Sequence, residues 1–96
     1  MRATLSLPYS KQISASANLC KLPCSLGGIF VSAASSTPTI TIYDDPATGT
    51  GLKLVDTFTP VAGTWYFLPF RCTAGLYVVI SGTVSCTVGW DPAVSP

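Results

Sequence analysis

The four cysteines are the side chains of this sequence best suited to chemistry. Cys20 and Cys24 form a C-x3-C pair, whereas thirteen residues separate Cys72 from Cys86. A structural zinc tetrad normally uses two closely spaced pairs, and the second pair lacks that spacing. An even count in a small domain favours disulfides, but no secretory signal supports an oxidising compartment. We expect reduced cysteines that pack as small hydrophobes, Cys86 beside Val84 above all, with disulfides and zinc as the alternatives.

Acid–base chemistry has few candidate groups. The chain has no histidine and no glutamate, so such work would fall to Asp44, Asp45, Asp56 or Asp91. Asp44 and Asp45 precede a proline, which favours turn residues whose carboxylates accept nearby backbone N–H groups. A calcium site built from these two and Asp56 is the alternative, although the spacing lacks the Asp/Asn/Gly alternation of a dedicated loop. No phosphate-binding, nucleophile or zinc-protease motif occurs, so we expect no enzyme and no cofactor.

An aromatic cluster is the remaining candidate site. Its members are Trp65, Tyr66, Phe67 and Phe70, with Trp90 and Tyr77. In a strand, Trp65 and Tyr66 must point to opposite faces, so one is expected to face inward and the other outward. Core packing and a protein interface explain such residues more often than a sugar-stacking platform, which stays open as an alternative.

The composition points to a surface that is partly covered by other molecules. The chain has 96 residues, of which 48% are hydrophobic and only 9% charged, with a formal net charge of +1. Net charge near zero does little to oppose association. The basic residues are scattered singly, so neither nucleic acid nor an anionic membrane is an expected partner. No apolar stretch approaches the length of a transmembrane helix or of a cleaved signal.

The elements that must position these residues are strands. From Gly27 onward apolar and polar residues alternate with a period near two, and strong helix formers are almost absent. The pattern predicts six strands, over residues 26–33, 38–43, 52–60, 65–70, 76–80 and 83–90. Their spacing is typical of an antiparallel β-sandwich, and we expect a jelly-roll-like one.

The breaks between these strands carry turn signals. Residues 44–51 predict a hairpin loop, and Ser81-Gly82 predicts a short turn. Pro69 cannot donate to a ladder, so the aromatic strand should end, bulge or lie at an edge there. Residues 1–25 are expected to form an N-terminal arm or short strand, separate from a sandwich domain over 26–96.

Four of these segments carry a family resemblance. TITIYD (39–44), GLKLVDTFTP (51–60), GTWYFLPF (63–70) and GLYVVISGT (75–83) resemble small all-β virion proteins of tailed bacteriophages. Within that group the chain is most similar to head decoration, or cement, proteins. The resemblance implies a β-sandwich without a cofactor, made in the host cytoplasm and located on the capsid surface. It also implies binding to the major capsid protein and to other copies of itself, as a possible homotrimer.

Partner contacts are expected first in the N-terminal segment. An arm without a core of its own gains most by packing on a neighbour, which favours Leu5, Leu7 and Tyr9. Arg2 and Lys11 would add charge complementarity to an acidic capsid surface. A phage tail or baseplate component, or a carbohydrate-binding module, is the alternative function.

Overall fold

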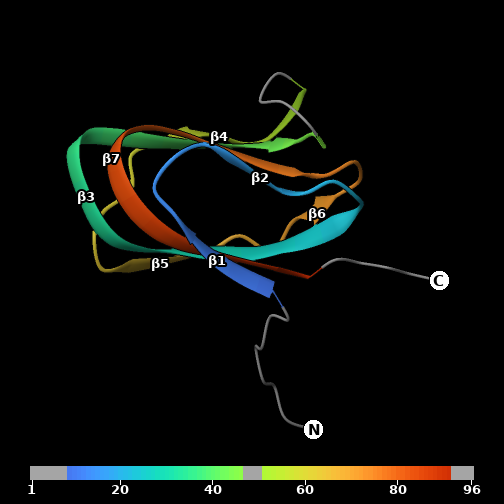
Figure 1. Cartoon of the computed structure of the whole chain (residues 1–96), viewed down its shortest axis with the longest axis horizontal. Helices are drawn as coiled ribbons and strands as arrows, with labels where there is room; N and C mark the ends of the chain where they lie inside the picture. The colour runs from blue at the N-terminus through green and yellow to red at the C-terminus, as the bar shows by residue number, and fades with distance from the viewer. Residues whose placement is uncertain (1–8, 47–50, 92–96) are drawn as a thin grey trace, which may run out of the picture.

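The computed structural model describes residues 9–46 and 51–91, which are all-β and contain no helix (Figure 1). The strands are β1 (Tyr9–Ile13), β2 (Ala17–Cys20), β3 (Cys24–Asp44), β4 (Leu52–Phe58), β5 (Thr64–Phe67), β6 (Arg71–Cys72) and β7 (Leu76–Asp91). Every strand pair is antiparallel, so the expected antiparallel all-β class is confirmed. The sheet order is β1-β7-β3-β4, with β2 also on β7, and β5 and β6 also on β3.

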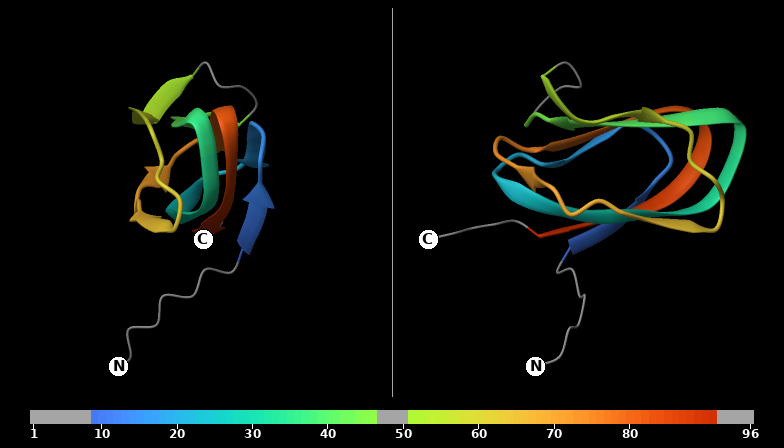
Figure 2. Two further views of the ribbon diagram at one scale, coloured as in Figure 1. Left: turned by 90° about the vertical axis from the view of Figure 1, so that its left-hand side faces the viewer. Right: turned by 180° about the vertical axis from the view of Figure 1, so that it is seen from behind.

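The two longest strands, β3 and β7, organise the whole sheet. They pair along most of their length, from Leu26 with Trp90 to Tyr43 with Tyr77. Both strands bend at the same place, so the sheet curls over and its two halves face each other (Figures 1 and 2). The lower half in Figure 1 contains β1, β5, β6, residues 83–91 of β7 and residues 24–35 of β3. The upper half contains β2, β4, residues 76–81 of β7 and residues 39–44 of β3.

The bend is made where turn residues meet across the two strands. β3 pairs with β7 at Ser35 and again at Thr39, so residues 36–38 lie opposite Gly82 alone. Extra residues on one strand bend the ladder and increase its twist. Thr37 (φ 49°) and Gly82 (φ 85°) supply the left-handed backbone that this corner needs. The expected turn at Gly82 is therefore a bend inside one strand, and four of the six expected strands merge in pairs into the long strands β3 and β7.

Replacing Gly82 with alanine should weaken the corner. A side chain at positive φ costs roughly 1–2 kcal/mol, because its Cβ crowds the neighbouring carbonyl. We expect Gly82→Ala to lower the free energy of unfolding by about that amount, as measured by urea denaturation. Ser81→Ala, at the neighbouring exposed position, is the control and should change stability by less than about 0.5 kcal/mol. Equal effects of the two substitutions would contradict this account of the bend.

The core lies between the two halves of the curled sheet. Period-two alternation sends every second side chain of each half inward. Val84, Cys86, Val88 and Trp90 share that inner face as expected. The core residues with the least exposure are Leu26, Ile29, Val31, Ile40, Ile42, Leu76, Val78, Val84, Val88, Cys24, Cys72 and Cys86.

Two local expectations are also confirmed. Residues 44–51 connect a hairpin, because Asp44 pairs with Leu52 where β3 ends and β4 begins. The aromatic strand is shorter than expected, since β5 ends at Phe67, before Pro69. Beyond it the chain is irregular, with the Phe70 N–H donating to Leu68 O at 2.8 Å.

The N-terminal part of the chain belongs to the sheet as far as the structure describes it. β1 pairs with the last residues of β7, and β2 pairs with the first residues of β7. The Ile13 side chain is buried, and the Tyr9 ring packs on Trp90 with 5.9 Å between centroids. An arm or a short strand was expected over 1–25, and the described part of that range contains two short strands of the sheet, while residue 25 lies inside β3. Apolar contacts at Tyr9 and Ile13 tie these residues to the core.

Candidate functional site

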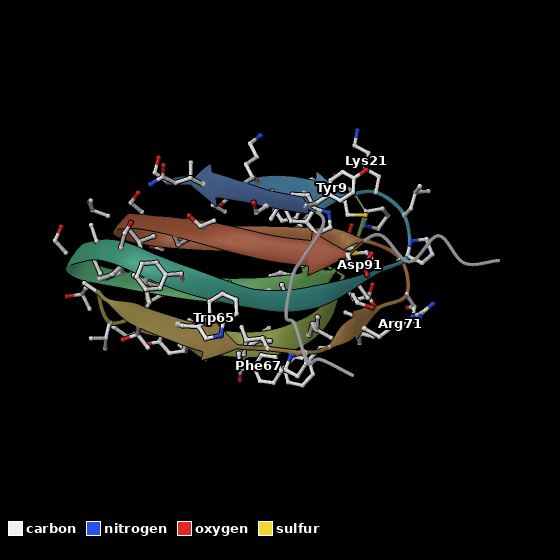
Figure 3. All side chains as sticks on the ribbon, turned by 90° about the horizontal axis from the view of Figure 1, so that it is seen from below. Tyr9, Lys21, Trp65, Phe67, Arg71 and Asp91 are labelled. Atoms are coloured by element: carbon white, nitrogen blue, oxygen red, sulfur yellow. The ribbon has the colours of Figure 1, made fainter. Side chains whose placement is uncertain are left out.

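The outer face of the lower half carries an exposed aromatic patch, which consists of Phe30, Trp65 and Phe67. Phe30 lies on β3 directly opposite Trp65 on β5, and Gly28 lies opposite Phe67. Trp65 and Phe67 are 42% and 58% exposed, and Phe30 is 41% exposed. Trp65 and Phe67 follow one another along the edge strand of this half (Figure 3). Three large rings on one sheet face are unusual for a surface that otherwise carries small polar residues.

Gly28 determines how the Trp65 indole lies. A Cβ atom added at Gly28 would stand 2.6 Å from Cη2 of Trp65 and 2.5 Å from the backbone oxygen of Tyr66. The benzene side of the indole therefore lies against the glycine backbone, while the residue as a whole stays 42% exposed. Gly28 pairs with Gly89 of β7, so the sheet beside the Trp65 ring has no side chain at either of these two positions.

The rest of the same face is polar and internally hydrogen-bonded. Gln12 Nε2 donates to Ser85 Oγ at 2.9 Å, and Ser32 Oγ donates to Ser85 O at 3.0 Å. At one end, Ser25 pairs with Arg71 on one side and Asp91 on the other, and both charged residues are exposed (Figure 3). An apolar centre with a polar rim is the usual anatomy of a protein interface.

The structure divides the aromatic cluster that the sequence singled out. Trp65 faces outward and Tyr66 inward, where its ring packs on Phe58 with 5.1 Å between centroids. Trp90 is only 7% exposed and belongs to the core. Tyr77 lies on the upper half of β7, away from the patch. Trp65 and Phe67 of the expected cluster therefore belong to the aromatic patch, whereas Phe70 is exposed in the irregular segment after β5.

Phe30 is the member of the patch that the sequence did not reveal. It stands between Ile29 and Val31, so all three positions are apolar and alternation cannot say which of them faces outward. Both neighbours are fully buried, which leaves Phe30 on the outer face. Its pairing with Trp65 depends on the register of β3 and β5, and no local signal fixes that register.

Two of the five expected partner residues are described, and they lie at the other edge of the lower half. Tyr9 and Lys11 are exposed on β1, where Lys11 pairs with Val88. Arg2, Leu5 and Leu7 lie outside the described residues. Because β1 and β5 are opposite edges of this half, the Tyr9 edge and the aromatic patch are separated by β7 and β3 (Figure 3).

Asp44 is a structural carboxylate at the junction of β3 and β7. Its Oδ2 accepts from Thr73 N at 2.9 Å and Thr73 Oγ1 at 2.8 Å. Its Oδ1 accepts from Ala74 N at 2.7 Å and Gly75 N at 3.2 Å. Burial alone would raise the pKa of Asp44, but these hydrogen bonds outweigh it and hold the pKa below its ordinary value. The carboxylate fixes the turn between β6 and β7, although the sequence predicted only local backbone partners.

This lowered pKa predicts loss of stability in acid. Asp44 binds a proton more readily in the unfolded chain than in the folded one. The contribution of Asp44 to the free energy of unfolding is therefore fully present above its ordinary pKa of 3.8. It is lost as the pH falls through the lower, folded-state pKa. We expect the urea midpoint to fall below about pH 4. The Asp44→Asn variant should lack this contribution to the pH dependence. If its urea midpoint falls in acid as steeply as that of the wild type, Asp44 is not the cause.

Asp56, Cys24 and Cys72 also have neighbours within the protein. Asp56 accepts from Thr57 N at 2.8 Å and forms an exposed ion pair with Lys53 at 3.2 Å. Within residues 9–46 and 51–91, no three His, Cys, Asp or Glu side chains are placed to hold a metal ion. Cys24 of β3 lies opposite Cys72 of β6.

Comparison with protein-family models, curated proteins and solved structures finds no match to this chain. In the part of the chain that the structure describes, no helix has the length and apolar character to cross a membrane.

Proposed function

We propose that this chain is a structural virion protein, specifically a capsid decoration (cement) protein. It binds the assembled head and stabilises contacts between neighbouring major capsid subunits. The observation that carries the proposal is the aromatic patch of Phe30, Trp65 and Phe67 on a sheet face with little charge. Aromatic residues are enriched at protein interfaces and dominate their binding energy. The resemblance to phage virion proteins gives the class of partner.

The fold that we propose is a jelly roll, supported by the strand order. The lower half runs β1, β7, β3, β5, and the upper half runs β2, β7, β3, β4. β3 and β7 each contribute one strand to each half, and β5 and β6 together count as one edge strand. Each half is then a layer of four strands. Eight strands in two layers is the plan of the jelly roll, which recurs in viral capsid and lectin domains.

Two separated contact surfaces suit a protein that joins two subunits. The aromatic patch lies at the β5 edge, whereas Tyr9 and Lys11 lie at the β1 edge of the same half. In the proposal the patch contacts one capsid subunit. The segment that leads into β1, with Arg2, Leu5 and Leu7, contacts the next. A protein that binds only the assembled shell stabilises that state by mass action.

The proposal is tested by counting copies in purified virions. Quantitative mass spectrometry should find this chain in a fixed, near-stoichiometric ratio to the major capsid protein. Absence from virions would overturn the proposal. A few copies per particle would overturn its capsid-wide form and favour a tail or baseplate location.

A carbohydrate-binding module is the second candidate, and one observation favours it. The Trp65 indole is held against Gly28 and is 42% exposed, and an exposed, fixed aromatic ring is what a sugar-stacking platform needs. A glycan array would show binding that Trp65→Ala abolishes and Leu52→Ala, an exposed substitution on β4, leaves intact. No binding to any glycan at high protein concentration would remove this candidate.

A further inference from the structure

Three cysteines gather at the end of the sheet where β2, β3 and β6 meet. Cys24 and Cys72 are directly opposed partners in the β3–β6 pair, and neither has any exposed surface. The Cys20 thiol at the end of β2 is partly exposed, donates to Leu22 O at 3.2 Å and hydrogen-bonds with Cys24. The fourth cysteine, Cys86, lies in the core without such a partner thiol. Of the three clustered thiols, Cys20 is thus partly exposed, and Cys24 and Cys72 are fully buried.

We infer that Cys24 and Cys72 form a cross-strand disulfide when the protein meets a small-molecule disulfide, with Cys20 as the thiol through which oxidation enters. Opposed Cα atoms of an antiparallel pair lie roughly 4.5–5.5 Å apart. Disulfides span Cα distances of roughly 4.4–6.8 Å, so the Cα separation of such a pair suits the bond. This inference concerns the thiols alone and stands independently of the proposed virion role.

The reaction balances as three successive thiol–disulfide exchanges. The Cys20 thiolate attacks the small disulfide, forms a mixed disulfide and releases one small thiol. The Cys24 thiolate then attacks the Cys20 sulfur, forms Cys20–Cys24 and releases the second small thiol. Finally the Cys72 thiolate attacks the Cys24 sulfur, which forms Cys24–Cys72 and returns Cys20 to a thiol. In total two protein thiols are oxidised, and one small disulfide is reduced to two thiols.

The surroundings explain why entry begins at Cys20 and why the reaction is slow near neutral pH. Burial, together with the neighbouring thiols, raises the pKa of Cys24, and burial raises the pKa of Cys72 to about 11. Because the thiolate is the attacking species, both groups react slowly at pH 7 and faster as the pH rises. Their burial also keeps a bulky oxidant out, whereas Cys20 has exposed surface.

The bond would join a short strand covalently to its neighbour. β6 has only two residues, and besides its ladder to β3 the segment is held by Leu26 N donating to Phe70 O at 2.8 Å and by Thr73 donating to Asp44. A disulfide between Cys24 and Cys72 closes a long loop that contains the bend and β4. Closing a long loop restricts the unfolded chain strongly. We expect the Tm to rise by about 10 °C on oxidation.

The test uses the full chain, reduced and then incubated with oxidised glutathione at pH 8.5. Thiols alkylated after denaturation should fall from four to two. Trypsin cleaves after Lys21 and Arg71, which places Cys20, Cys24 and Cys72 on three different peptides. Chymotrypsin cleaves after Tyr77 and separates Cys72 from Cys86. Non-reduced peptide mass spectrometry should find Cys24 joined to Cys72, with Cys20 and Cys86 free.

The Cys20→Ser variant tests the entry role, because this exposed end of β2 tolerates a change that the core would not. It should form the same bond at least about tenfold more slowly than the wild type. Four remaining thiols, a final Cys20–Cys24 bond, or any bond to Cys86 would overturn the inference. An unchanged rate in Cys20→Ser would overturn the entry route, and zinc retained stoichiometrically by the purified protein would overturn the disulfide.

Discussion

Replacing Asp44 with asparagine is expected to lower the free energy of unfolding by about 3 kcal/mol and the Tm by about 12–24 °C. The carboxylate accepts four hydrogen bonds from Thr73, Ala74 and Gly75. An asparagine amide keeps one acceptor oxygen and turns an NH2 group toward the donors of the other pair. The donors that face the NH2 group then lose their partner, and because these hydrogen bonds are part-buried or, at Gly75, buried, each such loss costs about 1–3 kcal/mol.

The effect should be measured by urea denaturation with tryptophan fluorescence, since Trp65 and Trp90 report from an exposed and a buried position. Asp56→Asn is the matched control, because Asp56 is exposed and its ion pair with Lys53 lies at the surface. Surface pairs of this kind contribute about 0–1 kcal/mol. If both variants unfold at the same urea concentration, Asp44 does not fix the turn before β7.

If the chain is the decoration protein proposed above, removing the Trp65 indole should weaken its binding to the capsid by about 30-fold, which corresponds to about 2 kcal/mol. Trp65 is the largest ring of the aromatic patch and lies between Phe30 and Phe67. A ring that is fixed on Gly28 before binding loses little conformational freedom when a partner covers it. The measurement is cosedimentation of Trp65→Ala with heads that have been stripped of the native protein.

The control is Leu52→Ala, which removes an apolar side chain that is 72% exposed on β4 in the opposite half of the sheet. It should bind heads as the wild type does. Circular dichroism and thermal unfolding should show that Trp65→Ala stays folded, since the indole contributes to the outer face and not to the core. Unchanged binding by Trp65→Ala, or equal loss in Leu52→Ala, would contradict a docking role for the patch.

From residue 26 onward, the sequence by itself determined where most of the strand residues lie and which side of those strands is buried. Alternation is a local property of the extended chain, so Ile40 with Ile42, and Val84 with Cys86, could be assigned to one face without knowing their partners. The hairpin at 44–51 was predictable for the same reason, because proline and glycine act on their own backbone. These local signals gave the antiparallel all-β class.

The tertiary structure decided everything that depends on which distant segments pair. Gly82 carries the same local signal whether its flanking segments form a hairpin with each other or both pair with β3. Only the long pairing of β3 with β7 makes it a bend. In the same way Asp44 finds its donors about thirty residues away, and Cys24 meets Cys72 through the register of β6.

The aromatic cluster that could do chemistry shows both contributions. Local alternation required Trp65 and Tyr66 to face opposite ways, and the structure confirms it. Which of the two faces outward, and that Phe30 joins Trp65 there, was decided by the register of β5 on β3. Registers are set by the packing of a whole face against the core, and a single strand does not contain that information.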